Sequence, residues 1–202
     1  MSETRDRRRK SDLDLFVLAL INSGVSTPYT LQKEAGLSPG AAIPVIQRLL
    51  QAGLIRQGKP GLRGRTECRI TASGRNQLKS GWRSLIDEGP SGDLDADLRV
   101  ALLAISEGNA YSAAVQMLKR SAAKLLEMGQ AISTGTEPHA PIALARLYRD
   151  LRSISVRALL DGQATAATTM AESLPRKLSG KRRGASSSSP KKAPLGRIKR
   201  LK

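Results

Sequence analysis

The chain of 202 residues has only one cysteine, Cys68, and one histidine, His139. A single cysteine excludes an intrachain disulfide and a zinc site built from several cysteines. A single histidine excludes a cluster of histidine ligands. The alternating residues Asp93, Asp95 and Asp97 lack the glycine and the terminal glutamate of a calcium loop. We therefore expect no metal, no cofactor and no enzymatic activity.

Aromatic residues and long hydrophobic runs are also scarce. Aromatic residues make up 2% of the chain, so leucine, alanine, valine and isoleucine must build the core. No apolar run is long enough to span a membrane. The apolar stretch 16–21 follows a basic segment, as in a signal peptide, but Asp12 and Asp14 interrupt it and no small-residue cleavage site follows. We expect a cytoplasmic protein, which the lone cysteine also suits.

Acidic residues are missing from the C-terminal end. The formal net charge is +17, and residues 175–202 contribute +11 of it from eleven basic residues and no acid. Residues 1–10 add +3, whereas residues 11–88 carry +4 and residues 89–174 carry −1. The chain thus has two basic ends and a nearly neutral middle. Basic terminal segments of this kind are typical of arms that contact nucleic acid. Because neither end has an apolar pattern, we expect both to be disordered.

The segment 38–53, SPGAAIPVIQRLLQAG, carries the clearest helical pattern in the chain. Ser38 suits the N-cap, Pro39 suits the first helical position and Gly53 suits the stop after the helix. Helical spacing predicts a buried face made of Ala42, Val45, Ile46, Leu49 and Leu50. The opposite face is small or uncharged and consists of Gly40, Ala41, Ile43, Pro44 and Gln47. Such a face suits close approach to another surface, and the N-terminal end of the helix suits a phosphate.

A shorter predicted helix precedes this segment. Thr27 and Pro28 repeat the start made of a cap and a proline, and Gly36 is the expected end. Two helices joined by a turn at Gly36 and Leu37 have the spacing of a helix-turn-helix, with the second helix in the recognition position.

Two short strands are predicted after the second helix, at residues 54–56 and 68–70. The loop between them is rich in glycine and basic residues, including Lys59, Arg63 and Arg65. A helix-turn-helix followed by a basic hairpin predicts a winged helix that binds DNA. The alternative is any small helical domain that carries a hairpin.

The order of motifs in this region extends the interpretation. Residues 40–49, GAAIPVIQRL, are followed by Gly53 and Leu54, by the basic loop, and by residues 69–74, RITASG. Over residues 12 to 86 the chain resembles the PadR-like family of bacterial transcriptional regulators, whose recognition helix carries Gly-Ser-Leu-Tyr-Pro-Ala-Leu-x-Arg-Leu. Ala41, Ile43 and Cys68 depart from the family's serine, tyrosine and aromatic residue. The resemblance implies that a small effector or a stress signal releases the DNA, with the helical region as the part that senses it.

Residues 93–174 predict helices only, after a linker at residues 88–93. The last helix, starting near Pro141, repeats apolar residues in steps of three and four at Leu144, Leu147, Leu151, Ile154 and Ala158. Such a seam packs on other helices of the chain or across a dimer. Regulators with a winged helix usually dimerise to match two half-sites, so we expect a homodimer. The alternative is a monomeric helical subdomain.

The predicted fold is mainly α with a small β-hairpin, as a winged helix-turn-helix domain followed by a helical dimerisation region. Its parts are a disordered basic arm at 1–10, a DNA-binding domain at 11–88, a helical dimerisation and sensing region at 93–174, and a disordered basic tail at 175–202. We expect a sequence-specific transcription regulator, a repressor, that binds double-stranded DNA in the nucleoid and has no membrane partner.

The expected DNA-binding residues lie on the two helices and the wing. Gln47 is the best candidate for a hydrogen bond to a base, and the basic wing residues are placed for phosphate or the minor groove. Arg48 borders the buried face, so its partner is either DNA or a protein group such as Glu34. The full set is Thr27, Tyr29, Ser38, Pro39, Gly40, Ala41, Ile43, Pro44, Gln47, Arg48, Lys59, Arg63 and Arg65.

Two other functions fit parts of this pattern. A winged helix with a basic tail rich in serine, proline and lysine is also how linker histones are built, so an architectural protein that packs DNA without sequence preference is the main alternative. A winged helix that binds only proteins is the other, although it would not need a basic wing.

Overall fold

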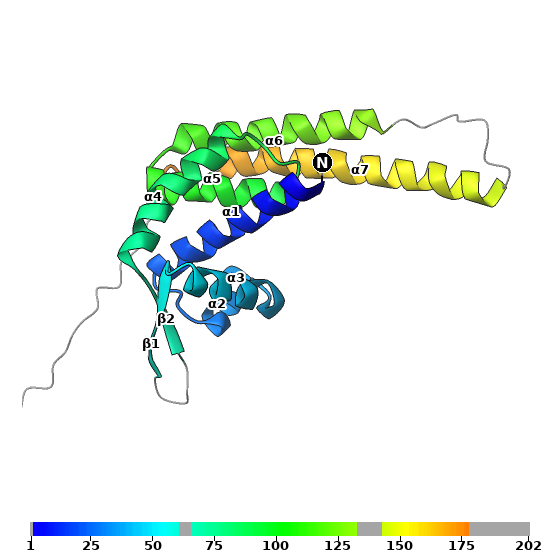
Figure 1. Ribbon diagram of the computed structural model, residues 1–202. Coiled ribbons are helices and arrows are strands. Elements are labelled where there is room, and N and C mark those ends of the chain that lie inside the picture. Colours follow the sequence, from blue (N-terminus) through cyan, green and yellow to red (C-terminus); the bar gives the residue numbers. More distant parts are fainter. Residues whose placement is uncertain (1, 61–65, 133–142, 178–202) are drawn as a thin grey trace, which may run out of the picture.

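The computed structural model describes residues 2–60, 66–132 and 143–177. These residues are mainly helical, with one two-stranded antiparallel sheet, which confirms the expected fold class at this level (Figure 1). The elements in chain order are α1 (Ser2–Asn22), α2 (Pro28–Ala35), α3 (Pro39–Gln51), β1 (Ile55–Pro60), β2 (Thr66–Ile70), α4 (Ala72–Asp87), α5 (Leu94–Gly108), α6 (Tyr111–Ala131) and α7 (Ala143–Ser173).

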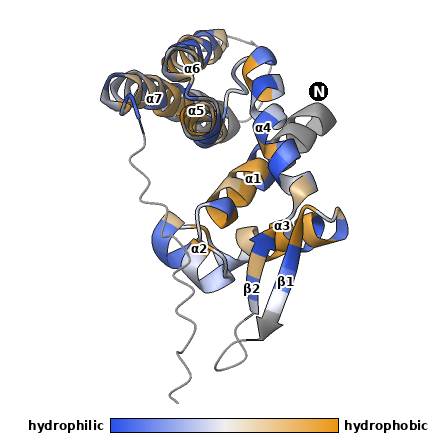
Figure 2. Ribbon diagram, turned by 90° about the vertical axis from the view of Figure 1, so that its left-hand side faces the viewer, coloured by the Kyte–Doolittle hydropathy of each residue, from blue (hydrophilic) through white to orange (hydrophobic). Residues whose placement is uncertain are grey.

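Helix α1 is the element on which both halves of the molecule pack. It contacts α3, α4 and β2 of the N-terminal half and α5 of the C-terminal half. Helices α5, α6 and α7 lie side by side on one side of α1, whereas α2, α3 and the hairpin lie on the other (Figures 1 and 2). Helix α4 leads from the hairpin to α5, and the predicted linker is the short connection between these two helices.

The start of α1 corrects one prediction. Residues 1–10 were expected to be disordered, but α1 begins at Ser2. The sequence holds a reason, because Glu3 and Asp6 stand four residues before Arg7 and Lys10, and acid-before-base pairs at this spacing stabilise a helix.

Burial along α1 is wider than a single helical face. Leu15, Val17, Leu18 and Ile21 are buried, and Phe16 is half-buried. An amphipathic stripe assumes one packed side. Because α1 has neighbours from both halves of the molecule, more of its circumference is enclosed.

Helix α7 packs on α6 with residues other than those of the predicted apolar seam. Its contact with α6 uses residues further along the helix, mostly small ones: Leu160, Ala164 and Ala167 are buried there. Leu151 and Ile154 of the seam are 56% and 57% exposed. Ala158 is exposed too, and the side chains of Leu144 and Leu147 lie outside the described residues. The seam is therefore not covered by the helices of its own chain over its described part.

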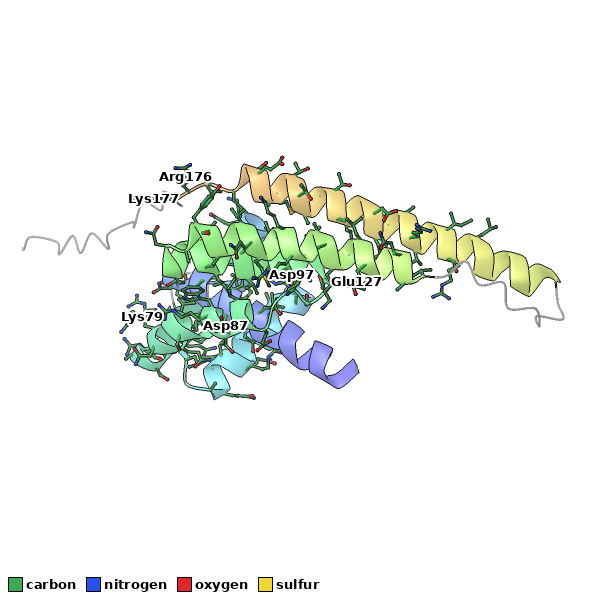
Figure 3. All side chains as sticks on the ribbon, turned by 90° about the horizontal axis from the view of Figure 1, so that it is seen from above. Lys79, Asp87, Asp97, Glu127, Arg176 and Lys177 are labelled. Atoms are coloured by element: carbon green, nitrogen blue, oxygen red, sulfur yellow. The ribbon has the colours of Figure 1, made fainter. Side chains whose placement is uncertain are left out.

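Two buried carboxylates tie the halves together. Asp12 of α1 is 0% exposed and accepts a hydrogen bond from Nε of Arg99 on α5 at 2.8 Å. Arg99 also pairs with Asp95, one turn earlier on α5. Asp97, likewise fully buried, accepts hydrogen bonds from the Ser91 hydroxyl at 2.9 Å and the Ser121 hydroxyl at 2.7 Å, which link the α4–α5 connection to α6 (Figure 3).

Burial raises the pKa of Asp12 above its ordinary value of 3.8, although the Arg99 hydrogen bond opposes this shift. One oxygen of Asp12, Oδ1, is buried and has no hydrogen-bond partner among the described residues. The charged form of Asp12 therefore depends on Arg99, since an unpaired buried carboxylate is strongly destabilising.

We expect Arg99→Met to lower the free energy of unfolding by about 3 kcal/mol at neutral pH, because it leaves Asp12 charged and unpaired. The loss should shrink as the pH falls toward 3.8, because the folded variant then holds a proton on Asp12 that the unfolded chain releases. The Asp12→Asn/Arg99→Met double variant should lose less than the single variant and show no such pH dependence. Urea unfolding at several pH values measures this, and equal losses in both variants at every pH would contradict it.

Candidate nucleic-acid interface

Helix α3 has two distinct faces, as its sequence predicts. Ala42, Val45, Ile46 and Leu49 are buried against the core, and Leu50 is half-buried. The opposite face carries no charge, and its residues Gly40, Ile43, Pro44 and Gln47 are exposed, with Ala41 half-buried. Ile43 is 45% exposed, so this face presents a large apolar side chain to solvent. The result is a smooth, uncharged ridge with one amide group on it.

The N-terminal end of α3 is capped as expected but offers fewer donors than the sequence suggested. The Ser38 hydroxyl accepts from the Ala41 N–H at 3.3 Å, and Pro39 has no N–H. Two of the first three positions of the helix therefore have no free N–H for a phosphate. The helix ends at Gln51, and Gly53 has a φ of 66°, the left-handed conformation predicted for the stop.

The N-terminus of helix α2 is stabilised by hydrogen bonds between its own residues. The Thr27 hydroxyl accepts from the Thr30 N–H at 3.1 Å, and the Thr30 hydroxyl accepts from the Thr27 N–H at 3.0 Å, which forms a capping box. Thr27, one of the predicted DNA-binding residues, is therefore half-buried and engaged within the chain. Tyr29, on the first turn of α2, is 57% exposed. Gly36 closes the helix with a φ of 67°.

Arg48 is bound within the protein rather than displayed on the ridge. Its Nε donates to Oδ2 of Asp14 on α1 at 3.1 Å, and its Nη2 donates to Oδ1 of the same carboxylate. This hydrogen bond raises the pKa of Arg48, so the guanidinium stays charged and paired. The partner differs from the expected Glu34. A bidentate pair of this kind fixes the angle of α3 against α1.

The hairpin lies beside α3, but only part of the predicted wing can be placed. The backbone of Lys59 is in β1; its side chain, and Arg63 and Arg65 as a whole, lie outside the described residues. The register pairs Arg56 of β1 with Arg69 of β2, and both side chains are exposed.

Like charges directly opposite each other disfavour a hairpin, so the Arg56–Arg69 pair is a candidate contact that sequence reasoning missed. The predicted strands could not reveal it, because pairing residues 54–56 with 68–70 end to end places Arg56 opposite Cys68, whereas the observed register is shifted by one residue.

Gly74 allows α3, the hairpin and α4 to pack closely where they meet, and this meeting point is called the joint below. A Cβ atom added at Gly74 would lie 2.1 Å from the carbonyl oxygen of Leu54, so only glycine fits there. Thr71 completes the joint: its N–H donates to Leu54 O at 3.0 Å, and its hydroxyl accepts from the Gly74 N–H at 3.1 Å. The Cys68 N–H donates to Ser26 O at 2.8 Å, which ties β2 to the chain before α2.

A scan against protein-family models finds no match, and neither does a search of curated proteins. The resemblance to PadR-like regulators therefore stays a prediction drawn from the sequence motifs of residues 40–74. In the part of the chain that the structure describes, no group of three or more acidic, cysteine or histidine side chains could hold a metal ion. Within the same residues, no helix has the length and apolar content needed to cross a membrane.

Proposed function

We propose that this chain is a transcription regulator of the PadR-like type, a repressor, and that α1 to α4 with the β1–β2 hairpin form a winged helix that binds double-stranded DNA. The observation that carries the proposal is the exposed ridge of α3. Its small and uncharged side chains permit close approach to the floor of the major groove, and Gln47 supplies a donor and an acceptor for a base edge. Such a protein acts on chromosomal DNA in the cytoplasm.

The division of roles follows from the contacts. Arg48 and Thr27 are engaged within the protein, so they orient α3 and α2 rather than bind DNA. Gln47, Pro44 and Ile43 are left to meet the bases. Arg56 and Arg69 are exposed on the hairpin, and Arg69 pairs with Glu67 at 3.9 Å, so Arg56 is the stronger candidate for a phosphate.

We propose further that two chains pair through the exposed part of α7. Leu151, Ile154 and Leu159 are exposed on α7. The N-terminal part of α7 projects past the end of α6 (Figure 1). Exposed apolar side chains clustered in this way mark a protein interface. A homodimer carries two copies of α3. One copy can then occupy each half-site of an operator, because the half-sites lie one helical turn apart.

The basic C-terminal end favours one other function. Arg176 and Lys177 follow the end of α7 and are exposed, and residues 175–202 contain eleven basic residues and no acid (Figure 3). Charge of this kind binds phosphate without sequence preference. An architectural DNA-packing protein is therefore the second candidate.

We expect Gln47→Ala to reduce the preference for the best site over a scrambled site by about 1–3 kcal/mol, the value of a good bidentate base contact. Binding to scrambled DNA should stay unchanged. Gln77→Ala is the matched control, because Gln77 is an exposed glutamine on α4. Affinities from fluorescence anisotropy at one fixed salt concentration measure both quantities. An unchanged preference in Gln47→Ala would contradict the role given to this residue.

For the dimer, we expect Leu151→Glu/Ile154→Glu to convert a dimer of the full chain into a monomer, because the substitutions place charge in an apolar interface. Thr165→Glu/Thr169→Glu is the control, since both threonines are exposed on α7 and point their hydroxyls at the backbone of their own helix. Light scattering gives the masses. A wild-type monomer, or a dimer that survives Leu151→Glu/Ile154→Glu, would contradict this interface.

A further inference from the structure

An open cavity of about 520 Å³ lies among α5, α6 and α7, at the end where α5 begins. Much of its wall is apolar and comes from all three helices: Leu98 of α5, Met128 of α6, and Leu160 and Met170 of α7. The two methionines have flexible, polarisable side chains, which adapt to ligands of different shape. The size suits a small organic molecule rather than an ion.

The charged side chains that line the cavity are all negative. Among the described residues, Asp93 and Asp95 line the cavity, Gln163 is the other polar side chain of the wall, and none of the lining side chains is basic. This is notable in a chain with a net charge of +17. Asp93 uses one carboxylate oxygen to cap α5, accepting from the Asp95 and Ala96 N–H groups. Asp95 instead has a side chain that is 78% exposed, so it is the carboxylate that an incoming ligand can reach.

We propose that this cavity binds an amphipathic organic cation. The apolar body of the ligand lies against the leucine and methionine side chains, and its ammonium group pairs with Asp95. An anion of the same shape is excluded, because it would meet carboxylates and find no basic side chain among the lining residues.

The cavity is connected to α1 through ion pairs. Asp95 also holds Arg99, and Arg99 reaches the buried carboxylate of Asp12. A ligand cation that pairs with Asp95 competes with Arg99 for the same carboxylate. Because α1 also carries Asp14, which holds Arg48 of α3, the bound ligand acts on the element that positions the ridge. This effect on DNA rests on the proposed function, whereas binding of the cation does not.

Titration calorimetry on the full chain tests the cavity. The probes are octyltrimethylammonium below its micellar concentration and octanoate, an anion with a similar apolar tail. We expect one octyltrimethylammonium bound per chain and no binding of octanoate. Asp95→Asn should weaken the cation by about fivefold, the factor that a partly exposed ion pair provides. Asp161→Asn, which removes an exposed carboxylate of α7 outside the cavity wall, should change nothing.

Three results would overturn the proposal: no binding of the cation to the wild-type chain, equal binding of octanoate, or equal weakening by Asp161→Asn. A second arm repeats the DNA titration with and without octyltrimethylammonium, and the cation should weaken DNA binding of the wild-type chain more than that of Asp95→Asn. DNA affinity that ignores the cation would overturn the coupling. A chain that binds the cation but no DNA would contradict the proposed function and leave the cavity assignment standing.

Discussion

The ion pair between Asp12 and Arg99 determines how the two halves of this protein meet. It joins α1, on which the DNA-reading candidates pack, to α5, which begins the C-terminal helices. Both side chains are nearly enclosed, so neither charge is stable without the other. Apolar side chains of α1 and α5 also pack together at this contact. The ion pair adds direction to that packing, because the Asp12 carboxylate has to meet the Arg99 guanidinium.

A second ion pair extends this arrangement to α3. Asp14 lies two residues after Asp12 on α1 and holds Arg48. Helix α1 thus uses one carboxylate toward each half of the molecule. The ridge of α3 owes its position to Asp14 and to the joint around Gly74, and neither of these groups has to touch DNA. The one polar side chain on the ridge is that of Gln47, which is why the proposed reading of sequence depends on it.

Local signals in the sequence predicted much of the N-terminal half. The caps at Thr27 and Ser38 and the left-handed glycines at Gly36 and Gly53 set the helix ends, and each depends on residues close in sequence. The pairing of Asp12 with Arg99 spans 87 positions, and no local pattern could identify it. The same limit explains Arg48, because a half-buried arginine on a helix has several possible partners until the neighbouring helix is placed. The uncovered seam of α7 was also beyond prediction, since periodicity shows which residues share a face but not which surface meets it.

The central claim is that the ridge of α3 reads DNA sequence in a paired protein. Selection of bound duplexes from a random pool by the full chain, at moderate salt, tests it most directly. Moderate salt weakens the contribution of the basic ends, so base contacts decide which duplexes remain. The account predicts enrichment of one motif made of two inverted half-sites, spaced by about one helical turn. Recovered duplexes without a shared motif would contradict it and favour the architectural function.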